Sequence, residues 1–133
     1  MLGITKGGIS YLLRLEGLCV LTIALIVYAK LGFGWNTFAL YFLVPDISLI
    51  GYLAGSRIGA LSYNLAHSYV GSIVLLGVGF VSMPALYCVG LIWIAHIGFD
   101  RSLGYGLKYA DGFGFTHLGL IGKKKRINIS INV

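Results

Sequence analysis

The stretch Asn36–Gly55, NTFALYFLVPDISLIGYLAG, is an apolar run of 20 residues interrupted near its middle by Pro45 and Asp46. At a rise of about 1.5 Å per residue, about 20 residues cross the roughly 30 Å hydrocarbon core of a bilayer. The run therefore predicts a membrane-spanning helix. Because proline removes a backbone hydrogen bond, it also predicts a kink beside a carboxylate at membrane depth.

Three further apolar runs of similar length flank this stretch, at Ile9–Leu31, Gly59–Val81 and Met83–Phe99. Of the 133 residues, 58% are hydrophobic and only 11% are charged, a composition that excludes an ordinary soluble domain. We predict an all-α fold, an integral membrane four-helix bundle formed by residues 1–119. Residues 120–133 are predicted to form a polybasic cytoplasmic tail around Lys123–Arg126.

The net charge of +6 predicts the orientation in the membrane through its placement along the chain. Nine of the ten Lys and Arg residues fall in the N-terminal segment, between the second and third runs, or in the C-terminal segment, and only Lys30 falls elsewhere. With four crossings, these three regions lie on one side. By the positive-inside rule we expect a multi-pass protein of the inner membrane with both termini cytoplasmic. We expect no nucleic-acid partner, because no soluble basic face exists to bind one.

The segment between Gly104 and His117 is rich in glycine and aromatic residues and is too polar for a fifth span. It is predicted to be a short cytoplasmic loop or a re-entrant lip against the mouth of the bundle. Before it, Gly51, Gly55 and Gly59 repeat every four residues, a spacing that lets helix backbones approach closely. Two alternatives stay open for these glycines, packing within one chain and the face of a homo-oligomer.

Several ionisable residues lie inside or at the edge of the apolar runs. Each costs on the order of 2.5–3.5 kcal/mol at membrane depth, so a set of them is typical of a functional site. His67 lies ten residues past Arg57, or roughly 15 Å, and His96 lies five residues before Arg101, or roughly 7 Å. The same arithmetic places Glu16 and Asp46 in the cytoplasmic half. We therefore predict one polar cavity in that half of the membrane.

Four of these residues form a candidate metal-ligand set: Asp46, His67, His96 and Asp100. His96 and Asp100 are four residues apart and share one helix face. Helical bundles build metal sites from inward carboxylates and histidines, and this nitrogen and oxygen set suits zinc, manganese or iron. The alternative is a metal-free network in which each histidine pairs with a carboxylate.

Several short motifs are similar to those of a known family: RLEG (14–17), PDISLIGY (45–52), YNLAH (63–67), AHIGFDR (95–101), GYGLKY (104–109) and THLG (116–119). Over residues 11–119 the chain resembles a family of small bacterial membrane proteins, classed as a domain of unknown function (number 4260). The resemblance implies a bacterial four-span protein and carries no activity.

A looser similarity links the chain to bacterial inner-membrane metal-dependent hydrolases, which also array a Pro-Asp pair and membrane histidines in this order. Their His-Arg-x-x-Thr-His-Ser core is absent, and His67-Ser68 and Thr116-His117 match only parts of it.

The function predicted on these grounds is a metal-dependent hydrolase acting from the cytoplasmic face. A divalent, zinc-type metal would activate a water molecule, and Glu16 or His117 would move protons. Arg101 and Lys108 would hold an anionic lipid headgroup as ligand or substrate. The alternatives are a proton-relay or transport component and a non-catalytic membrane scaffold. Placement of the ionisable groups in one half of the membrane favours the hydrolase over the relay.

Overall fold

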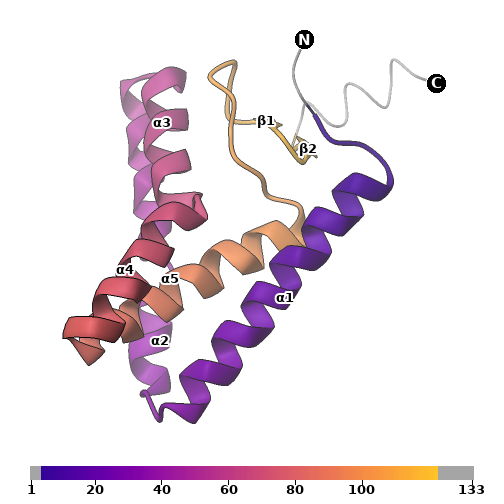
Figure 1. The fold of residues 1–133 in the computed structure, drawn as a ribbon. Coiled ribbons are helices and arrows are strands. Elements are labelled where there is room, and N and C mark those ends of the chain that lie inside the picture. Colours follow the sequence, from indigo (N-terminus) through magenta and orange to yellow (C-terminus); the bar gives the residue numbers. More distant parts are fainter. Residues whose placement is uncertain (1–3, 123–133) are drawn as a thin grey trace.

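Helical segments make up most of the described chain, residues 4–122, in the computed structural model (Figure 1). In chain order they are α1 (Gly8–Lys30), α2 (Trp35–Tyr41), the 3₁₀ helix η1 (Val44–Ala54), α3 (Ser56–His67), α4 (Tyr69–Ser82) and α5 (Pro84–Leu103). The segments α2 and η1 form one run along the molecule, and α3 and α4 form another (Figure 1). The predicted all-α bundle is confirmed.

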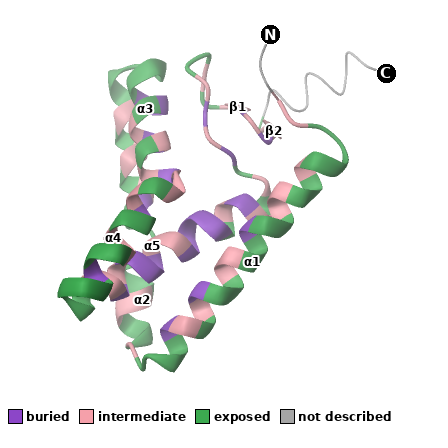
Figure 2. Ribbon diagram, in the orientation of Figure 1, coloured by how far each residue is buried: buried purple, intermediate pink, exposed green. Residues whose placement is uncertain are grey.

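Helix α5 is the centre of the bundle and has the largest number of buried residues of these helices (Figure 2). It packs against α1 on one side and α4 on the other, while η1 pairs with α3. Gly17 of α1 faces Gly98 of α5, so the two backbones approach closely. At the other end of α1, Tyr28 is fully buried among the rings of Phe33, Trp35 and Phe38.

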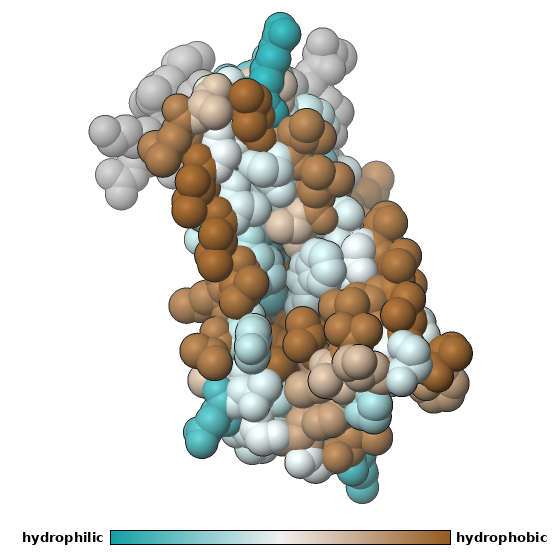
Figure 3. Space-filling model, turned by 90° about the vertical axis from the view of Figure 1, so that its left-hand side faces the viewer, coloured by the Kyte–Doolittle hydropathy of each residue, from teal (hydrophilic) through white to brown (hydrophobic). Residues whose placement is uncertain are grey.

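Three of the described helical segments are long and apolar enough to cross a membrane: Gly8–Lys30, Trp35–Ala54 and Ser56–Ser82. Their outward faces carry large apolar side chains, such as Leu53 and Val81, which are 89% and 85% exposed. Figure 3 shows one side of the molecule, where brown apolar side chains lie along both flanks of a paler band and teal hydrophilic side chains lie near the two ends. An apolar exterior of this kind is typical of a membrane protein.

The fourth expected span, Met83–Phe99, exists as the 20-residue helix α5 but is not among these three segments. His96, Asp100 and Arg101 lie in its second half and lower its mean hydropathy. Its neighbours in the bundle cover most of these residues, so α5 depends less on lipid contact than the other segments do. A fourth crossing stays a prediction.

The second apolar run is broken at Pro45, as the predicted kink requires. Helix α2 ends at Tyr41, and the chain continues from Val44 as a 3₁₀ helix with Pro45 in its first turn. The amide of Asp46 donates to the carbonyl of Leu43 at 3.1 Å, an i→i+3 bond. Eleven residues of 3₁₀ helix are unusual, because runs longer than three or four are uncommon.

The third apolar run is also broken, at Ser68, and the sequence did not predict this break. Ser68 is extended, with φ −89° and ψ 149°, between α3 and α4. Arg101 Nη2 donates to the carbonyl oxygen of His67 at 2.7 Å. The break thus supplies an acceptor to a buried guanidinium, which has to find hydrogen-bond partners inside the bundle.

The segment after α5 lies against one end of the bundle, as expected, and adds a small antiparallel pair of strands. Strand β1 (Phe115–Thr116) pairs with β2 (Gly119–Leu120). Asn64 of α3 exchanges hydrogen bonds with the backbone of Lys108, at 2.7 and 2.8 Å. The amide of Thr5 donates to the carbonyl of His117, so the two ends of the described chain meet. Lys123–Arg126 lies outside the described residues.

Packing within one chain accounts for two of the three regularly spaced glycines. A Cβ on Gly51 would collide with Ser62, and one on Gly59 would collide with the ring of Tyr52. Gly55, with φ +115°, makes the turn between η1 and α3. A homo-oligomer stays a prediction, and Gly51 and Gly59 lend it no support.

Close approach of α1 and α5 predicts that Gly98→Ala is destabilising. A Cβ at this position would lie 2.7 Å from the carbonyl oxygen of Gly17 and 2.8 Å from the amide of Leu21. We expect a loss of about 2 kcal/mol, within the usual range for overpacking, measured by unfolding in detergent. The matched control is Gly77→Ala in α4, where a Cβ meets nothing within 4 Å. A control loss as large as that at Gly98 would contradict the prediction.

Candidate metal centre

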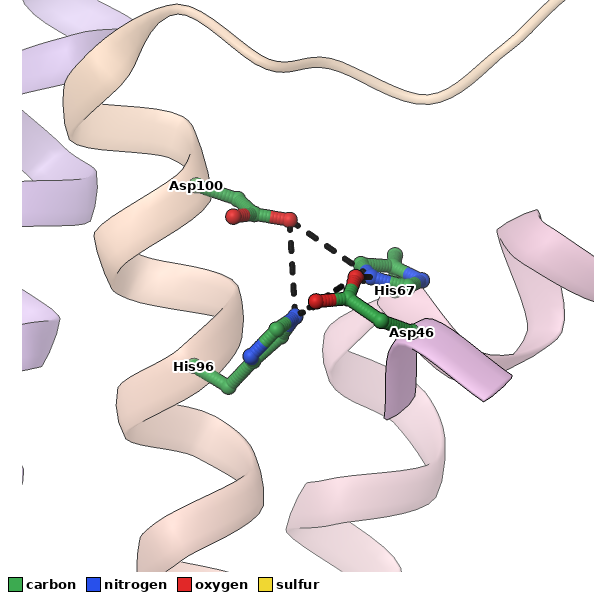
Figure 4. A group of neighbouring side chains, drawn as sticks. All are labelled: Asp46, His67, His96 and Asp100. Carbon is green, nitrogen blue, oxygen red and sulfur yellow. Dashed lines mark hydrogen bonds and ion pairs between the residues drawn. The ribbon is translucent and has the colours of Figure 1, made fainter. Parts of the chain in front are cut away.

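Four side chains from three helices converge on one point: Asp46 of η1, His67 of α3, and His96 and Asp100 of α5 (Figure 4). One ligand atom from each lies within 4.8 Å of all the others. The predicted convergence of these residues is therefore observed.

Each of these residues owes its position to a local feature of the backbone. Asp46 follows Pro45 in the first turn of η1, and His67 is the last residue of α3 before the break at Ser68. His96 and Asp100 lie one turn apart on α5 and point toward the other two (Figure 4). The two helix breaks therefore bring η1 and α3 to the face of α5 that carries these groups.

The tautomer of His67 follows from its hydrogen bonds. Its Nδ1 lies 3.0 Å from the carbonyl oxygen of Tyr63, which can only accept, so Nδ1 carries the proton. In the neutral ring, Nε2 then presents a lone pair to the cluster. The Tyr63 ring stacks on His67 with centroids 3.8 Å apart and holds the imidazole in this orientation. This is the tautomer and the type of backbone partner that histidine ligands commonly have.

The separations between the ligand atoms are short. Nε2 of His67 lies 3.1 Å from Nε2 of His96, and 3.2 and 3.5 Å from the oxygens of Asp46 and Asp100. Nε2 of His96 lies 3.4 and 3.5 Å from the same oxygens. A tetrahedral ion with bonds of about 2.0–2.1 Å requires its ligand atoms about 3.3–3.4 Å apart. Five of the six separations are thus close to those of a tetrahedral site.

The cluster contains few hydrogen-bond donors that could link these ligand atoms to one another. With both carboxylates ionised, the oxygens of Asp46 and Asp100 and Nε2 of His67 are all acceptors. The Nε2 of His96 is then the one ring nitrogen that can donate. Electron-rich atoms this close repel one another in a low dielectric unless protons or a cation neutralise them.

The surroundings of His96 differ from those of His67. Its Nδ1 is buried and has no hydrogen-bond partner among the described residues. The ring makes edge contacts with Phe42 and His67, with centroids 5.1 Å away in both cases. On its Nδ1 side, His96 is therefore held by ring packing, and its polar neighbours all lie on the Nε2 side, in the cluster.

A second layer of groups lies beside Asp100. The hydroxyl of Tyr63 donates to Asp100 Oδ2 at 3.4 Å. The ammonium of Lys108 lies over the rings of Tyr63 and Phe113, 4.6 and 3.6 Å from their centroids, and donates to the carbonyl of Phe113. Lys108 is only 5% exposed. Burial lowers its pKa from 10.5 to about 8, against the opposing effect of the negative charge of Asp100.

Arg101 is 6% exposed, and its guanidinium donates hydrogen bonds to backbone oxygens. Nη2 donates to His67 and Nη1 to the carbonyl of Tyr105, both close to 2.8 Å. Arg101 thus ties the break after α3 to the loop after α5 and holds the backbone of His67.

Glu16 and His117 lie outside the cluster, in a separate cavity of about 240 Å³ lined also by Tyr69 and Arg101. Nδ1 of His117 accepts from the amide of Leu107 at 2.8 Å, so its proton is on Nε2. Burial, and then the charge of Arg101, lower the pKa of His117. Their predicted role in proton transfer is untested, and Arg101 lies between this cavity and the His67 carbonyl.

Two residues of the site were not singled out for a role by the sequence. Tyr63 contacts both His67 and Asp100, and its spacing of four from His67 was a usable signal. Asn64 binds the backbone of Lys108, which is 44 residues away, and no local pattern could have indicated that pairing.

Comparison with known protein families identifies the family to which the chain belongs. The family model for a domain of unknown function (DUF4260) matches residues 10–121, so the chain belongs to that family. Neither a curated protein nor a solved structure matches the chain. The looser similarity to metal-dependent hydrolases finds no support in these comparisons.

The depressed pKa of Lys108 predicts a pH-dependent stability. Between about pH 8 and 10.5 the unfolded state binds more protons at this lysine than the folded state, so stability rises with pH. We expect unfolding in detergent to show this rise in the wild type relative to Lys108→Met. A parallel pH dependence in both proteins would show that Lys108 titrates normally.

Proposed function

We propose that the Asp/His cluster binds a divalent, zinc-type metal ion and that the protein is a membrane-embedded metal-dependent hydrolase. The observation that carries the proposal is the set of ligand separations, 3.1–3.5 Å for the five measured pairs. A cation at their centre removes the repulsion between the carboxylates and the bare Nε2 of His67.

The donor set of two imidazoles and two carboxylates suits zinc, manganese or iron. Four protein ligands fill a tetrahedron, so a water ligand requires a fifth position, which zinc and the other two ions can accept. Asp46 supports an accessible site, because its side chain is 39% exposed while both histidines are buried.

A metal ion in this position would lower the pKa of a bound water molecule and polarise an ester or phosphoryl oxygen. The residues around it suit that chemistry. Tyr63 donates to Asp100 and keeps one of its oxygens oriented. The ammonium of Lys108 adds a positive charge near Asp100, and together with Arg101, which is also buried, it would attract an anionic lipid headgroup through its electrostatic field. Glu16 and His117 are our candidates for proton exchange with the aqueous side.

The metal proposal predicts a loss of bound metal in His96→Ala. Purified without chelators, the wild type should carry about one equivalent of a transition metal. His96→Ala loses one of four ligands, and we expect its metal affinity to fall by at least about 100-fold with hydrolysis abolished. The matched control is His117→Ala, which changes the same residue type outside the cluster and should keep its metal.

Elemental analysis of the three proteins and an X-ray absorption spectrum of the wild type provide the measurement. A wild type with less than about a tenth of an equivalent would overturn the proposal. A metal-free proton relay or scaffold would then be the better account, and His96→Ala would act through bundle stability instead.

We further propose that the end of the bundle nearest the cluster faces the cytoplasm of the cell. In the topology predicted from the sequence, Lys6, Arg14 and Arg57 lie on the side of that end. Lys30 lies on the other side, at the end of α1 before the turn to α2. The positive-inside rule supports this orientation. The apolar surface of the bundle makes the lipid bilayer its surroundings.

Reporter fusions test the orientation directly. A fusion after Gly34 should report the external side, and a fusion after Val133 should report the cytoplasm, because positively charged loops are retained inside. The opposite pattern at both positions would reverse the orientation. Fusions after Gly55, in the turn between η1 and α3, serve as a control and should also report the cytoplasm.

A further inference from the structure

An apolar cavity of about 340 Å³ lies between the second and third spans and α5, apart from the Asp/His cluster. Its walls include Tyr41 and Val44 of the second span, Leu75 of α4, and Val89 and Trp93 of α5. Cavities of this size, lined mostly by apolar side chains, are typical of small-ligand sites.

Two of the three polar side chains in the lining, Ser48 and Trp93, donate to backbone carbonyls, and the third, Tyr41, lies at the exposed rim. Ser48 Oγ donates to the carbonyl of Pro45 at 2.7 Å, and Trp93 Nε1 donates to the carbonyl of Ala66 at 2.6 Å. The Trp93 ring lies over Gly71, where any side chain would collide with it. These bonds keep the serine and the indole from binding a polar group, so the cavity favours a hydrocarbon occupant.

The cavity shares its wall with the candidate metal centre. Pro45 directly precedes Asp46, and Ala66 directly precedes His67. Trp93 lies three residues before His96 on α5. Three of the four ligands are thus neighbours, in sequence or along one helix turn, of residues that line the cavity.

The rim of the cavity is open to the surroundings of the protein. Tyr41 and Val44 are 42% and 46% exposed, at the break between α2 and η1 and close to Asp46. The surroundings at this depth are lipid, since the outward faces of the flanking spans are apolar. The bilayer therefore supplies hydrocarbon chains at the mouth of the cavity.

We propose that this cavity binds one hydrocarbon chain of a membrane lipid, whose hydrolysable polar group lies at the Asp/His cluster. The binding of the chain rests on the cavity, and the placement of the polar group at the cluster rests on the proposed function. The substrate class of the hydrolase is then a lipid that enters sideways from the bilayer.

Photolabelling tests the proposal with the full-length protein in phosphatidylcholine vesicles. The probe is a phosphatidylglycerol with a diazirine at the end of one acyl chain. We expect labelling of the peptides that contain Tyr41–Ser48 and Val89–Trp93. Val89→Phe fills the cavity and should reduce this labelling about fivefold, because the added ring occupies the space of the chain. The matched control is Val70→Phe, a residue of α4 that is 71% exposed, and it should label as the wild type.

Equal labelling of all outward faces, unchanged by Val89→Phe, would mean ordinary bulk lipid and would overturn the proposal. Crosslinks from these peptides to a second copy of the chain would also overturn it. Leu75→Phe fills the cavity from α4 and replaces Val89→Phe if that variant fails to fold.

Metal content is measured on the same samples. Loss of labelling with the metal retained supports both proposals. If Val89→Phe reduces labelling but the wild type binds no metal, the hydrocarbon site is supported and the metal-dependent hydrolase is contradicted. The two proposals can therefore fail separately.

Discussion

The mutual repulsion of four electron-rich atoms in a buried site is the constraint on which the rest of the structure depends. The Nε2 atoms of His67 and His96 lie 3.1 Å apart, and each lies within 3.5 Å of two carboxylate oxygens. Such a set is stable only when protons or a cation neutralise it. The break after α2 and the break at Ser68 bring Asp46 and His67 to the face of α5 that carries His96 and Asp100.

Convergence of the four ligand residues was the part of this arrangement that the sequence could predict. Rise per residue, counted from the charged ends of the apolar runs, put His67 and His96 in the same half of the membrane. The interval of four residues put His96 and Asp100 on one face of α5. Pro45 indicated the break that carries Asp46. These local rules suffice because a polar group at membrane depth has few places where it can be satisfied.

The sequence could not predict which face of each helix packs against which neighbouring helix. Helix α1 is apolar on all sides, so no stripe indicates which face packs against α5. Glu16 lies at a suitable depth but is exposed and lines another cavity. The break at Ser68 escaped prediction for a related reason, since it frees the carbonyl of His67 to accept from Arg101, 34 positions later in the chain. Pairings of that kind are set by the tertiary fold.

Residues beside the same two helix breaks belong to both a polar and an apolar compartment. Asp46 and His67 turn toward the cluster on α5, while Pro45 and Ala66, one residue earlier, line the apolar cavity, because successive residues of a helix point in different directions. A lipid has the same division, with a polar group joined to an apolar chain. The proposed hydrolase would need both environments side by side, and residues next to the breaks at Pro45 and Ser68 form part of the wall that the two environments share.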